Sequence, residues 1–191
     1  MNSAAERNLV HKAQAGDTQA FAELVQAHQR FAYNVALRSV NNSQDAEDIV
    51  QDAFVKAWKS LSRFRLEARF RTWLYRIVMN ICYNQLPKLR KELGCLEQGS
   101  GQVQLVETNP DMDPAAQLEG KETIAFVQQQ VKSLPGQYQI LLMLRYQQGC
   151  SYAEISEILD LPLGTVKTGI FRARERLKEA VYHLQEEWVR L

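Results

Sequence analysis

The segment formed by residues 151–178 restricts the possible folds more than any other part of the chain. Ser151 and Glu154 have the spacing of a capping box, in which each side chain bonds a backbone N–H that the first turn of a helix leaves free. The apolar pattern of this helix stops at Asp160, and Pro162 suits the first turn of a new helix. The sequence therefore predicts a short helix, a tight turn and a second helix.

The second helix has an apolar stripe on one side and basic residues on the other. Between Pro162 and Lys178, five Lys or Arg residues stand against a single acid, Glu175. A basic helix braced by a shorter one suits the major groove of DNA, between two phosphate backbones. A helical hairpin with a solvated basic face is the alternative, but the tight turn favours nucleic-acid binding. The apolar stripe consists of Val166, Ile170, Ala173 and Leu177.

Apolar stripes of helical period recur along the chain, and no segment alternates apolar and polar residues over the length of a strand. We therefore expect an all-α fold of two small helical domains joined by a flexible linker, with the helix-turn-helix in the C-terminal domain. The longest aliphatic run, residues 140–144, is too short to span a bilayer, and the N-terminus lacks the pattern of a signal peptide. A cytoplasmic protein without direct membrane insertion is expected.

The expected linker lacks a helical pattern. It contains the polar run 98–102 and few large apolar residues, and between Leu93 and Glu122 six acids stand against one base, Lys121. Such a segment buries too little apolar surface to order itself, and so long an unstructured stretch indicates a domain boundary.

Charge is strongly segregated, although the formal net charge is only +1. Residues 56–92 hold ten basic residues against Glu67 and Glu92, and the second helix of the helix-turn-helix forms another basic island. The rest of the chain is acidic, which suits contacts with protein partners.

The third helix of the N-terminal half, which begins near Phe70, follows a basic loop. Arg65 in the loop, Arg76 and Asn80 on one helix face, and the ring of Phe64 supply cations for phosphates, an amide for base edges and an aromatic for stacking. This combination is typical of a platform for single-stranded nucleic acid. Phe64 is either a stacking group or a core residue, whereas Phe70 and Trp73 lie on the apolar stripe and are expected in the core.

The helix that begins near Asp45 has an apolar stripe and a polar face. Asp48, Gln51, Asp52 and Lys56 lie on that face, which is either solvated or a docking surface for a protein.

Three stretches resemble the extracytoplasmic-function (ECF) group of sigma factors of bacterial RNA polymerase, the minimal two-domain members of the sigma-70 family. The resemblance covers nearly the whole chain. The stretches are residues 45–54 (DAEDIVQDAF), residues 70–80 with TWLYRI at their centre, and residues 164–167 (GTVK) with 171–174 (FRAR).

The resemblance implies a role for each part of the chain. Residues 1–90 would be a region 2 domain that docks on core polymerase and recognises and melts the minus-10 element; residues 91–118 would be a flexible acidic linker; residues 119–191 would be a region 4 domain that reads the minus-35 element. The implied polymerase-docking residues are Asp45, Asp48, Gln51, Asp52 and Phe54. The implied minus-10 residues are Phe64, Arg65, Arg76 and Asn80. The implied minus-35 residues are Lys167, Thr168, Phe171, Arg172 and Arg174.

The same resemblance implies the partners. They are core RNA polymerase, through its beta-prime clamp helices and its beta subunit, promoter DNA, and an anti-sigma factor, which in this family is often membrane-anchored.

No cofactor, metal or catalytic residue is expected, because three histidines and three cysteines are widely spaced and no phosphate-binding glycine loop occurs. A conventional activator or repressor, and a nucleic-acid enzyme, are the alternative classes of function. The first would need an effector pocket or a dimerisation helix.

Two positions depart from the family pattern. Asp160 stands where such turns often have Gly, and Asp tolerates left-handed backbone geometry better than most residues. Gly169 falls in the middle of the second helix, where the family often has Arg. We expect from the sequence that Gly169→Arg adds a DNA contact and steepens the salt dependence of binding.

Overall fold

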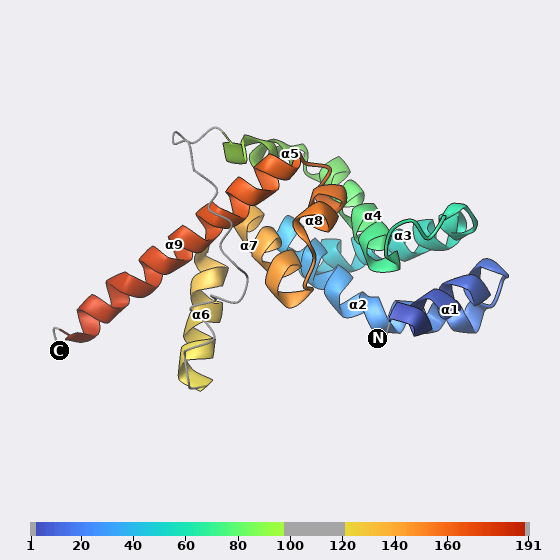
Figure 1. The fold of residues 1–191 in the computed structure, drawn as a ribbon, viewed down its shortest axis with the longest axis horizontal. Helices are drawn as coiled ribbons and strands as arrows, with labels where there is room; N and C mark the ends of the chain where they lie inside the picture. The colour runs from blue at the N-terminus through green and yellow to red at the C-terminus, as the bar shows by residue number, and fades with distance from the viewer. Residues whose placement is uncertain (1–2, 98–120, 190–191) are drawn as a thin grey trace.

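The structure, a computed structural model, describes residues 3–97 and 121–189 and is shown in Figure 1. Within these two ranges all regular structure is helical, which confirms the all-α expectation. The first range contains α1 (Ser3–Gln14), α2 (Thr18–Val40), α3 (Ser43–Ser60), the 3-10 turn η1 (Leu61–Arg63), α4 (Phe70–Gln85), α5 (Pro87–Gly94) and the 3-10 turn η2 (Cys95–Glu97). The second contains α6 (Lys121–Ser133), α7 (Gly136–Leu142), the π-helical turn η4 (Met143–Gln147), α8 (Tyr152–Leu159) and α9 (Leu163–Val189).

Short polar side chains set the boundaries of the first helices. The Asp17 carboxylate accepts hydrogen bonds from the backbone N–H groups of Gln19 and Ala20, which starts α2. The helix ends at Asn41, whose φ of 54° is left-handed, and Asn42 caps the start of α3. These two asparagines therefore separate α2 from α3.

Helices α1 to α4 pack around a core rich in alanine and aromatic residues. Alanines such as Ala32 and Ala53 are fully buried and let α2 and α3 approach closely. Tyr75 and Phe70 on α4 are among the largest buried side chains of the core. The core therefore covers one side of α4, whereas Arg76 and Asn80 of the same helix remain exposed.

Helical structure continues further than the sequence analysis expected. Residues 91–97 belong to the linker that the sequence predicts, but α5 and η2 extend to Glu97. Leu89, Leu93 and Leu96, at spacings of four and three, are buried and explain why these residues are helical. Residues 98–118, the rest of the expected linker, lie outside the described ranges.

The helix-turn-helix forms as predicted. Helix α8 starts at a capping box made by Ser151 and Glu154, and it ends at Asp160, which has a left-handed φ of 53°. Helix α9 then begins at Leu163 and is the longest helix in the described ranges. Val166, Ile170 and Ala173 bury its first turns against the rest of the C-terminal half.

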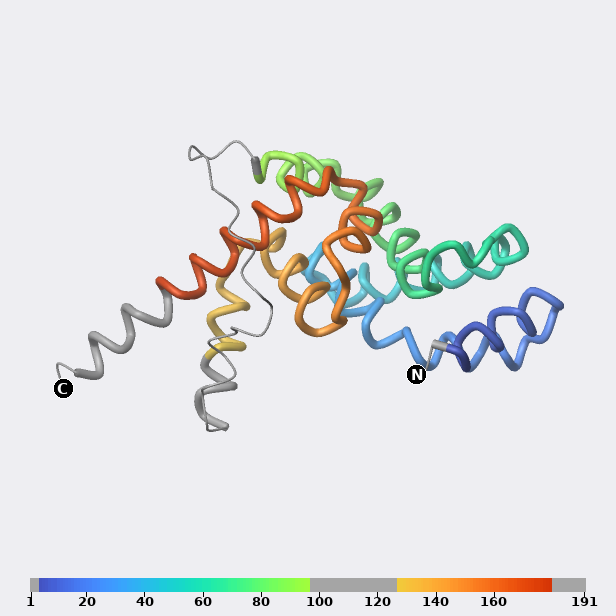
Figure 2. Tube along the Cα trace, in the orientation of Figure 1, coloured from blue at the N-terminus to red at the C-terminus, as the bar shows by residue number. Residues whose placement is uncertain are grey.

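The N-terminal and C-terminal halves lie directly against each other. Helix α8 packs on α4, α7 packs on α2, and the start of α9 packs on η2, an arrangement that can be followed in Figure 1 and along the trace in Figure 2. Within the described ranges, no helix is long and apolar enough to cross a membrane.

Candidate nucleic-acid interface

The turn before α9 is fixed by local hydrogen bonds. The Ser151 N–H donates to Glu154 Oε2 at 2.8 Å, and the Glu154 N–H donates to Ser151 Oγ at 3.1 Å. At the other end of α8, the Ser156 hydroxyl donates to the carbonyl of Leu161 in the turn at 2.5 Å. These contacts satisfy backbone groups at both ends of the brace helix. The angle at which α9 leaves the turn is therefore well defined.

The expected minus-35 residues lie on the side of α9 away from its buried stripe. Phe171 is 42% exposed, an unusual value for a large aromatic on a basic helix. Lys167, Thr168, Arg172 and Arg174 are half-buried. One face of α9 thus combines cations, a hydroxyl and an aromatic ring.

The edge of that face is covered by η2. The guanidinium of Arg172 donates a hydrogen bond to the backbone carbonyl of Leu96. A Cβ atom added at Gly169 would lie 2.7 Å from Leu141 Cδ1 and 2.9 Å from Leu96 Cδ1. Gly169 therefore faces packed side chains in this structure, and the expectation that an Arg at this position contacts DNA has no support here.

The expected minus-10 residues separate into two groups. Arg65, Arg76 and Asn80 are exposed, the first in the loop before α4 and the other two one turn apart on α4. Phe64 is only 8% exposed, and its ring stacks on Trp73 with centroids 4.8 Å apart and an interplanar angle of 25°. Phe64 is therefore a core residue in this structure and not an exposed stacking group.

The loop that carries Arg65 is anchored from α1. The side-chain amide of Gln14 donates hydrogen bonds to the carbonyls of Leu61 and Phe64, at 3.0 and 2.8 Å. Leu66 has a φ of 59°, which is unusual for a bulky residue and shows how tightly the loop turns. The anchoring holds Arg65 close to the first turns of α4.

The expected docking residues lie along α3. Asp45, Asp48, Gln51 and Asp52 are exposed, whereas Phe54 is buried at the floor of a groove between α2 and α3. The groove has a volume of about 810 Å³. Its walls are mainly apolar and include Phe21, Val25, Val50, Val55 and Trp58.

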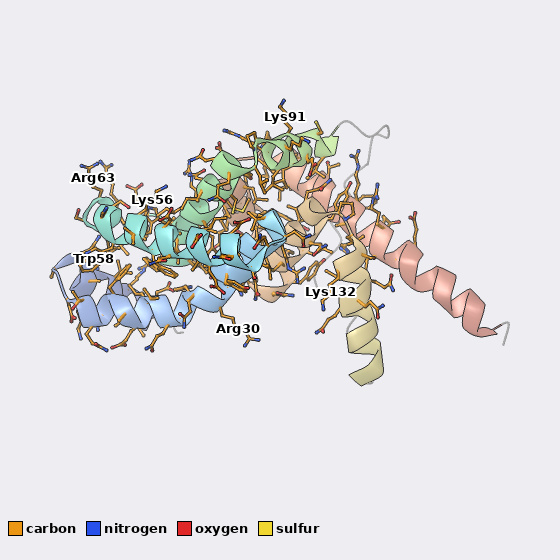
Figure 3. All side chains as sticks on the ribbon, turned by 180° about the vertical axis from the view of Figure 1, so that it is seen from behind. Arg30, Lys56, Trp58, Arg63, Lys91 and Lys132 are labelled. Atoms are coloured by element: carbon orange, nitrogen blue, oxygen red, sulfur yellow. The ribbon has the colours of Figure 1, made fainter. Side chains whose placement is uncertain are left out.

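Sequence reasoning missed the two exposed apolar residues of this groove. Val55 and Trp58 are 45% and 37% exposed, and the Trp58 ring lies 4.8 Å from that of Phe21. Figure 3 shows Trp58 between α2 and α3. The signal was present in the sequence, because Gln51, Val55 and Trp58 are spaced by four and three residues and share a helix face.

A set of polar contacts between α4 and the C-terminal half was also not foreseen. The Tyr83 hydroxyl donates to the carbonyl of Leu159 at 2.8 Å, and Arg71 donates to the carbonyl of Gln148 at 2.8 Å. Burial raises the pKa of the Tyr83 hydroxyl, so this group stays protonated and acts as a donor. Glu154 lies 3.5 Å from the guanidinium groups of Arg69 and Arg71.

The Glu154 carboxylate is therefore shared between the capping box and the N-terminal half. Burial on its own raises the pKa of this carboxyl, but the Ser151 N–H and the charge of Arg71 outweigh it, and the pKa lies below the ordinary value of 4.5. Glu154 is consequently a carboxylate at neutral pH.

Two of the three cysteines are buried thiols. Burial raises the pKa of the Cys82 and Cys150 thiols to about 11, so both are protonated at neutral pH, and Cys95 is exposed. Among the residues that the structure describes, no three His, Cys, Asp or Glu side chains gather where they could hold a metal ion.

Comparison with known proteins assigns the two halves. Residues 24–92 match the family described as Sigma-70 region 2, and residues 127–177 match Sigma-70, region 4. The fold resembles the structure of CnrH in complex with the cytosolic domain of CnrY, with 28% identity, a TM-score of 0.60, and coverage of 94% of this chain and 98% of that one. RpoE of Bartonella quintana, solved with the anti-sigma factor NepR, has a TM-score of 0.58 and coverage of 85% and 96% at 24% identity.

Similar proteins cover nearly the whole chain. The RNA polymerase sigma-H factor of Pseudomonas aeruginosa is 33% identical over 95% of this chain and 96% of its own length. The ECF RNA polymerase sigma factor SigW of Bacillus subtilis is 34% identical over 92% and 96%. The ECF sigma-E factor of Escherichia coli is 34% identical over 92% and 94%. The chain belongs to the sigma-70 family and is an alternative sigma factor of the extracytoplasmic-function group.

Proposed function

We propose that this sigma factor binds core RNA polymerase in the cytoplasm and directs it to promoters through two surfaces, one on each helical domain. The observation that supports this most is that one chain carries both a helix-turn-helix and a separate face with Arg65, Arg76 and Asn80. A helix in the major groove selects a duplex site, but it gives no reason for the strands to separate. The second face supplies groups suited to unpaired bases.

In region 4, taken as residues 119–191, α9 reads the minus-35 element. Phe171 offers an apolar contact for thymine methyl groups, and Lys167 and Arg172 offer donors for base edges or phosphates. Arg174 adds a further positive charge, and Thr168 adds a hydroxyl. The half-buried stems of these side chains limit the number of rotamers lost on binding.

In region 2, taken as residues 1–90, the loop and α4 hold the opened minus-10 strand. Arg65 and Arg76 contact phosphates, while the Asn80 amide pairs with the edge of an extruded base. Phe64 acts from within the aromatic cluster with Trp73, because its ring supports the loop that carries Arg65.

Polymerase docks on α3. The carboxylates of Asp45, Asp48 and Asp52 surround Gln51 on an exposed face, next to the apolar groove with Val55 and Trp58. An apolar centre with a charged rim is the usual composition of a protein interface. The beta-prime clamp helices occupy this surface, and region 4 contacts the beta subunit.

An anti-sigma factor, often membrane-anchored in this family, holds the protein inactive. The relative RpoE was solved with the anti-sigma factor NepR, and CnrH was solved with the cytosolic domain of CnrY. We propose that an inhibitor of this kind competes with polymerase for the exposed surface of α3.

Reconstituted transcription tests the proposal. Purified protein is added to core polymerase and a library of genomic fragments from the source bacterium, and the transcripts are sequenced. We expect start sites that share one minus-35 and one minus-10 sequence and that depend on the added protein. Trp58→Ala should reduce the binding of core polymerase, whereas Lys12→Ala on α1 should leave it unchanged. Transcription that does not depend on the protein would contradict the proposal.

A further inference from the structure

The loop of residues 61–69, which carries Arg65, is held by a single side chain at the end of α1. Gln14, the last residue of α1, donates both N–H bonds of its side-chain amide into this loop, to the carbonyl of Leu61 at 3.0 Å and to that of Phe64 at 2.8 Å. The Leu61 carbonyl also accepts the backbone N–H of Phe64 at 3.0 Å. One amide therefore joins the two ends of the η1 turn that precedes Arg65.

The backbone after this turn has an unfavourable conformation. Phe64 is only 8% exposed and Leu66 is half-buried, whereas Arg65 between them is exposed. The φ of 59° at Leu66 is left-handed, and a bulky residue keeps such a conformation only where surrounding contacts enforce it. The direction in which Arg65 points therefore depends on contacts that hold the loop in this shape.

Helix α1 also supplies contacts to the second part of the loop. Glu6, Arg7 and Val10 of α1 line one side of a small hollow, and Leu66 and Ala68 line the other. Val10 is fully buried. The loop is thus backed by α1 on both sides of Arg65.

The position of α1 is itself fixed by the region 2 core. Glu6 Oε1 lies 2.9 Å from Nε2 of His28 on α2, and both side chains are largely buried. The other ring nitrogen of His28 lies 3.2 Å from the hydroxyl of Tyr75 on α4. A helix held in this way gives Gln14 a fixed place from which to bond the loop.

We propose that Gln14 is a positioning residue for promoter opening, which holds the loop of residues 61–69 in the shape that presents Arg65 to the opened strand. The proposal rests on the function proposed above for Arg65. Gln14 is half-buried, and its amide donors are already used inside the protein, so it acts through Arg65 and not by contact with DNA. Because only the correctly shaped loop binds, the apparent affinity for the strand falls with the fraction of molecules that have this shape.

Gln14→Met is the variant that tests this role, because it keeps the length of the side chain and removes both donors. Asn8→Leu is the matched control, since it also replaces a side-chain amide of α1 with an apolar group of similar size, at an exposed position. Both variants should unfold at the same urea concentration as the wild type to within a small fraction of the transition, and both should bind core polymerase normally.

Trypsin cleavage of the free protein measures the loop without DNA. Arg63 and Arg65 are exposed, and Figure 3 shows Arg63 at the outer edge of the molecule. Loss of two hydrogen bonds should raise the rate of cleavage after these two residues about fivefold to a hundredfold in Gln14→Met, and not in Asn8→Leu. Cleavage after Arg30 and Lys56, on α2 and α3, should keep its rate. Unchanged cleavage of the loop, or equal acceleration at all four sites, would overturn the proposal.

Binding of an unpaired minus-10 strand to the holoenzyme measures the consequence for DNA. The affinity of Gln14→Met should fall by a factor no larger than that of Arg65→Ala, because Gln14 acts through this arginine. A template with a pre-melted minus-10 region should show the same defect, since unpairing the bases does not restore the loop. Asn8→Leu should match the wild type on both. Full affinity in Gln14→Met would overturn the proposal.

A double-mutant cycle separates positioning from a general structural role. If Gln14 acts through Arg65, Gln14→Met should lower strand affinity by a much smaller factor in an Arg65→Ala background than in the wild type. A structural defect elsewhere in region 2 would lower it by the same factor in both backgrounds, which would overturn the proposal.

The single variant Arg65→Ala shows which of the two claims fails. If Arg65→Ala retains full strand affinity, the function proposed for this loop is rejected and the role of Gln14 in promoter opening is rejected with it. If Arg65→Ala is defective while Gln14→Met binds the strand as well as the wild type does, only the positioning role is rejected.

Discussion

The rings of Phe64 and Trp73 stack 4.8 Å apart at the point where the loop before α4 meets the helix. Phe64 also lies edge-on to Phe70, with centroids 6.2 Å apart. The residue that the sequence offered as a stacking group for bases is thus part of an internal aromatic cluster. Replacement of Phe64 should therefore lower the stability of the fold, and promoter opening should suffer only as a consequence.

Phe64→Ala should therefore lower the free energy of unfolding by about 3 kcal/mol, because truncation of a buried aromatic leaves a cavity. Phe64→Leu should cost less, since it keeps most of the buried volume. Urea unfolding followed by circular dichroism gives both values. A Phe64→Ala variant as stable as the wild type would mean that the ring spends its time outside the cluster.

The shared carboxylate of Glu154 predicts a dependence on pH. Its pKa in the folded protein lies below the ordinary value of 4.5, so its contribution to stability is complete above pH 4.5 and is lost as the pH falls through the lower, folded value. Glu154→Gln keeps the capping box, because Gln also serves in that position, but it removes the charge that faces Arg71.

The difference in stability between wild type and Glu154→Gln should hence be largest above pH 4.5 and shrink on acidification. Unfolding curves of both proteins between about pH 3 and pH 7, a range that covers the titration of a carboxyl group, measure this difference in stability. A constant difference across that range would show that the charge of Glu154 contributes nothing.

Gly169 gives opposite predictions from sequence and structure. On an exposed helix face, replacing Gly should stabilise the protein by about 1 kcal/mol through helix propensity. The close approach of Leu141 and Leu96 predicts instead that Gly169→Arg lowers stability by about 1 to 3 kcal/mol, because the new side chain displaces packed leucines. Thermal unfolding distinguishes the two signs, and a stabilised variant would contradict the packing described here.

The elements of this fold were accessible from the sequence because their signals are local. Ser151 and Glu154 mark the start of α8, and Asp160 adopts the left-handed geometry that ends it. The ECF motifs then indicated the family. The helical extension to Glu97 departs from the sequence prediction because the stripe of Leu89, Leu93 and Leu96 is short and is flanked by polar residues, so its helical order depends on tertiary burial.

The contacts between domains were not accessible in this way. Tyr83 and Leu159 are 76 residues apart in the sequence, and no local sequence pattern at either residue predicts contact with the other. The sequence predicts a lost DNA contact at Gly169, because a glycine carries no signal of the leucines that fill the space beside it. Both features depend on tertiary packing, which local sequence patterns do not encode.

Opening of promoter DNA is the step that distinguishes a sigma factor from other DNA-binding proteins, and the exposed Asn80 amide is the group assigned to it. Asn80→Ala removes hydrogen bonds to one base, so open complex should fall about tenfold to a hundredfold. Binding of polymerase and formation of the closed complex should stay nearly intact, because Asn80 belongs to α4, whereas the residues assigned to docking and to the minus-35 element belong to α3 and α9. A template with a pre-melted minus-10 region should recover only part of the loss.

Permanganate reactivity of unpaired thymines, measured beside gel-shift binding on duplex and pre-melted templates, tests this most directly. With core polymerase and wild-type protein, thymines of the minus-10 element should become reactive on duplex DNA, and with Asn80→Ala they should remain largely protected while the closed complex persists. Equal loss of closed and open complexes in Asn80→Ala, or no reactive thymines with the wild type, would contradict the account.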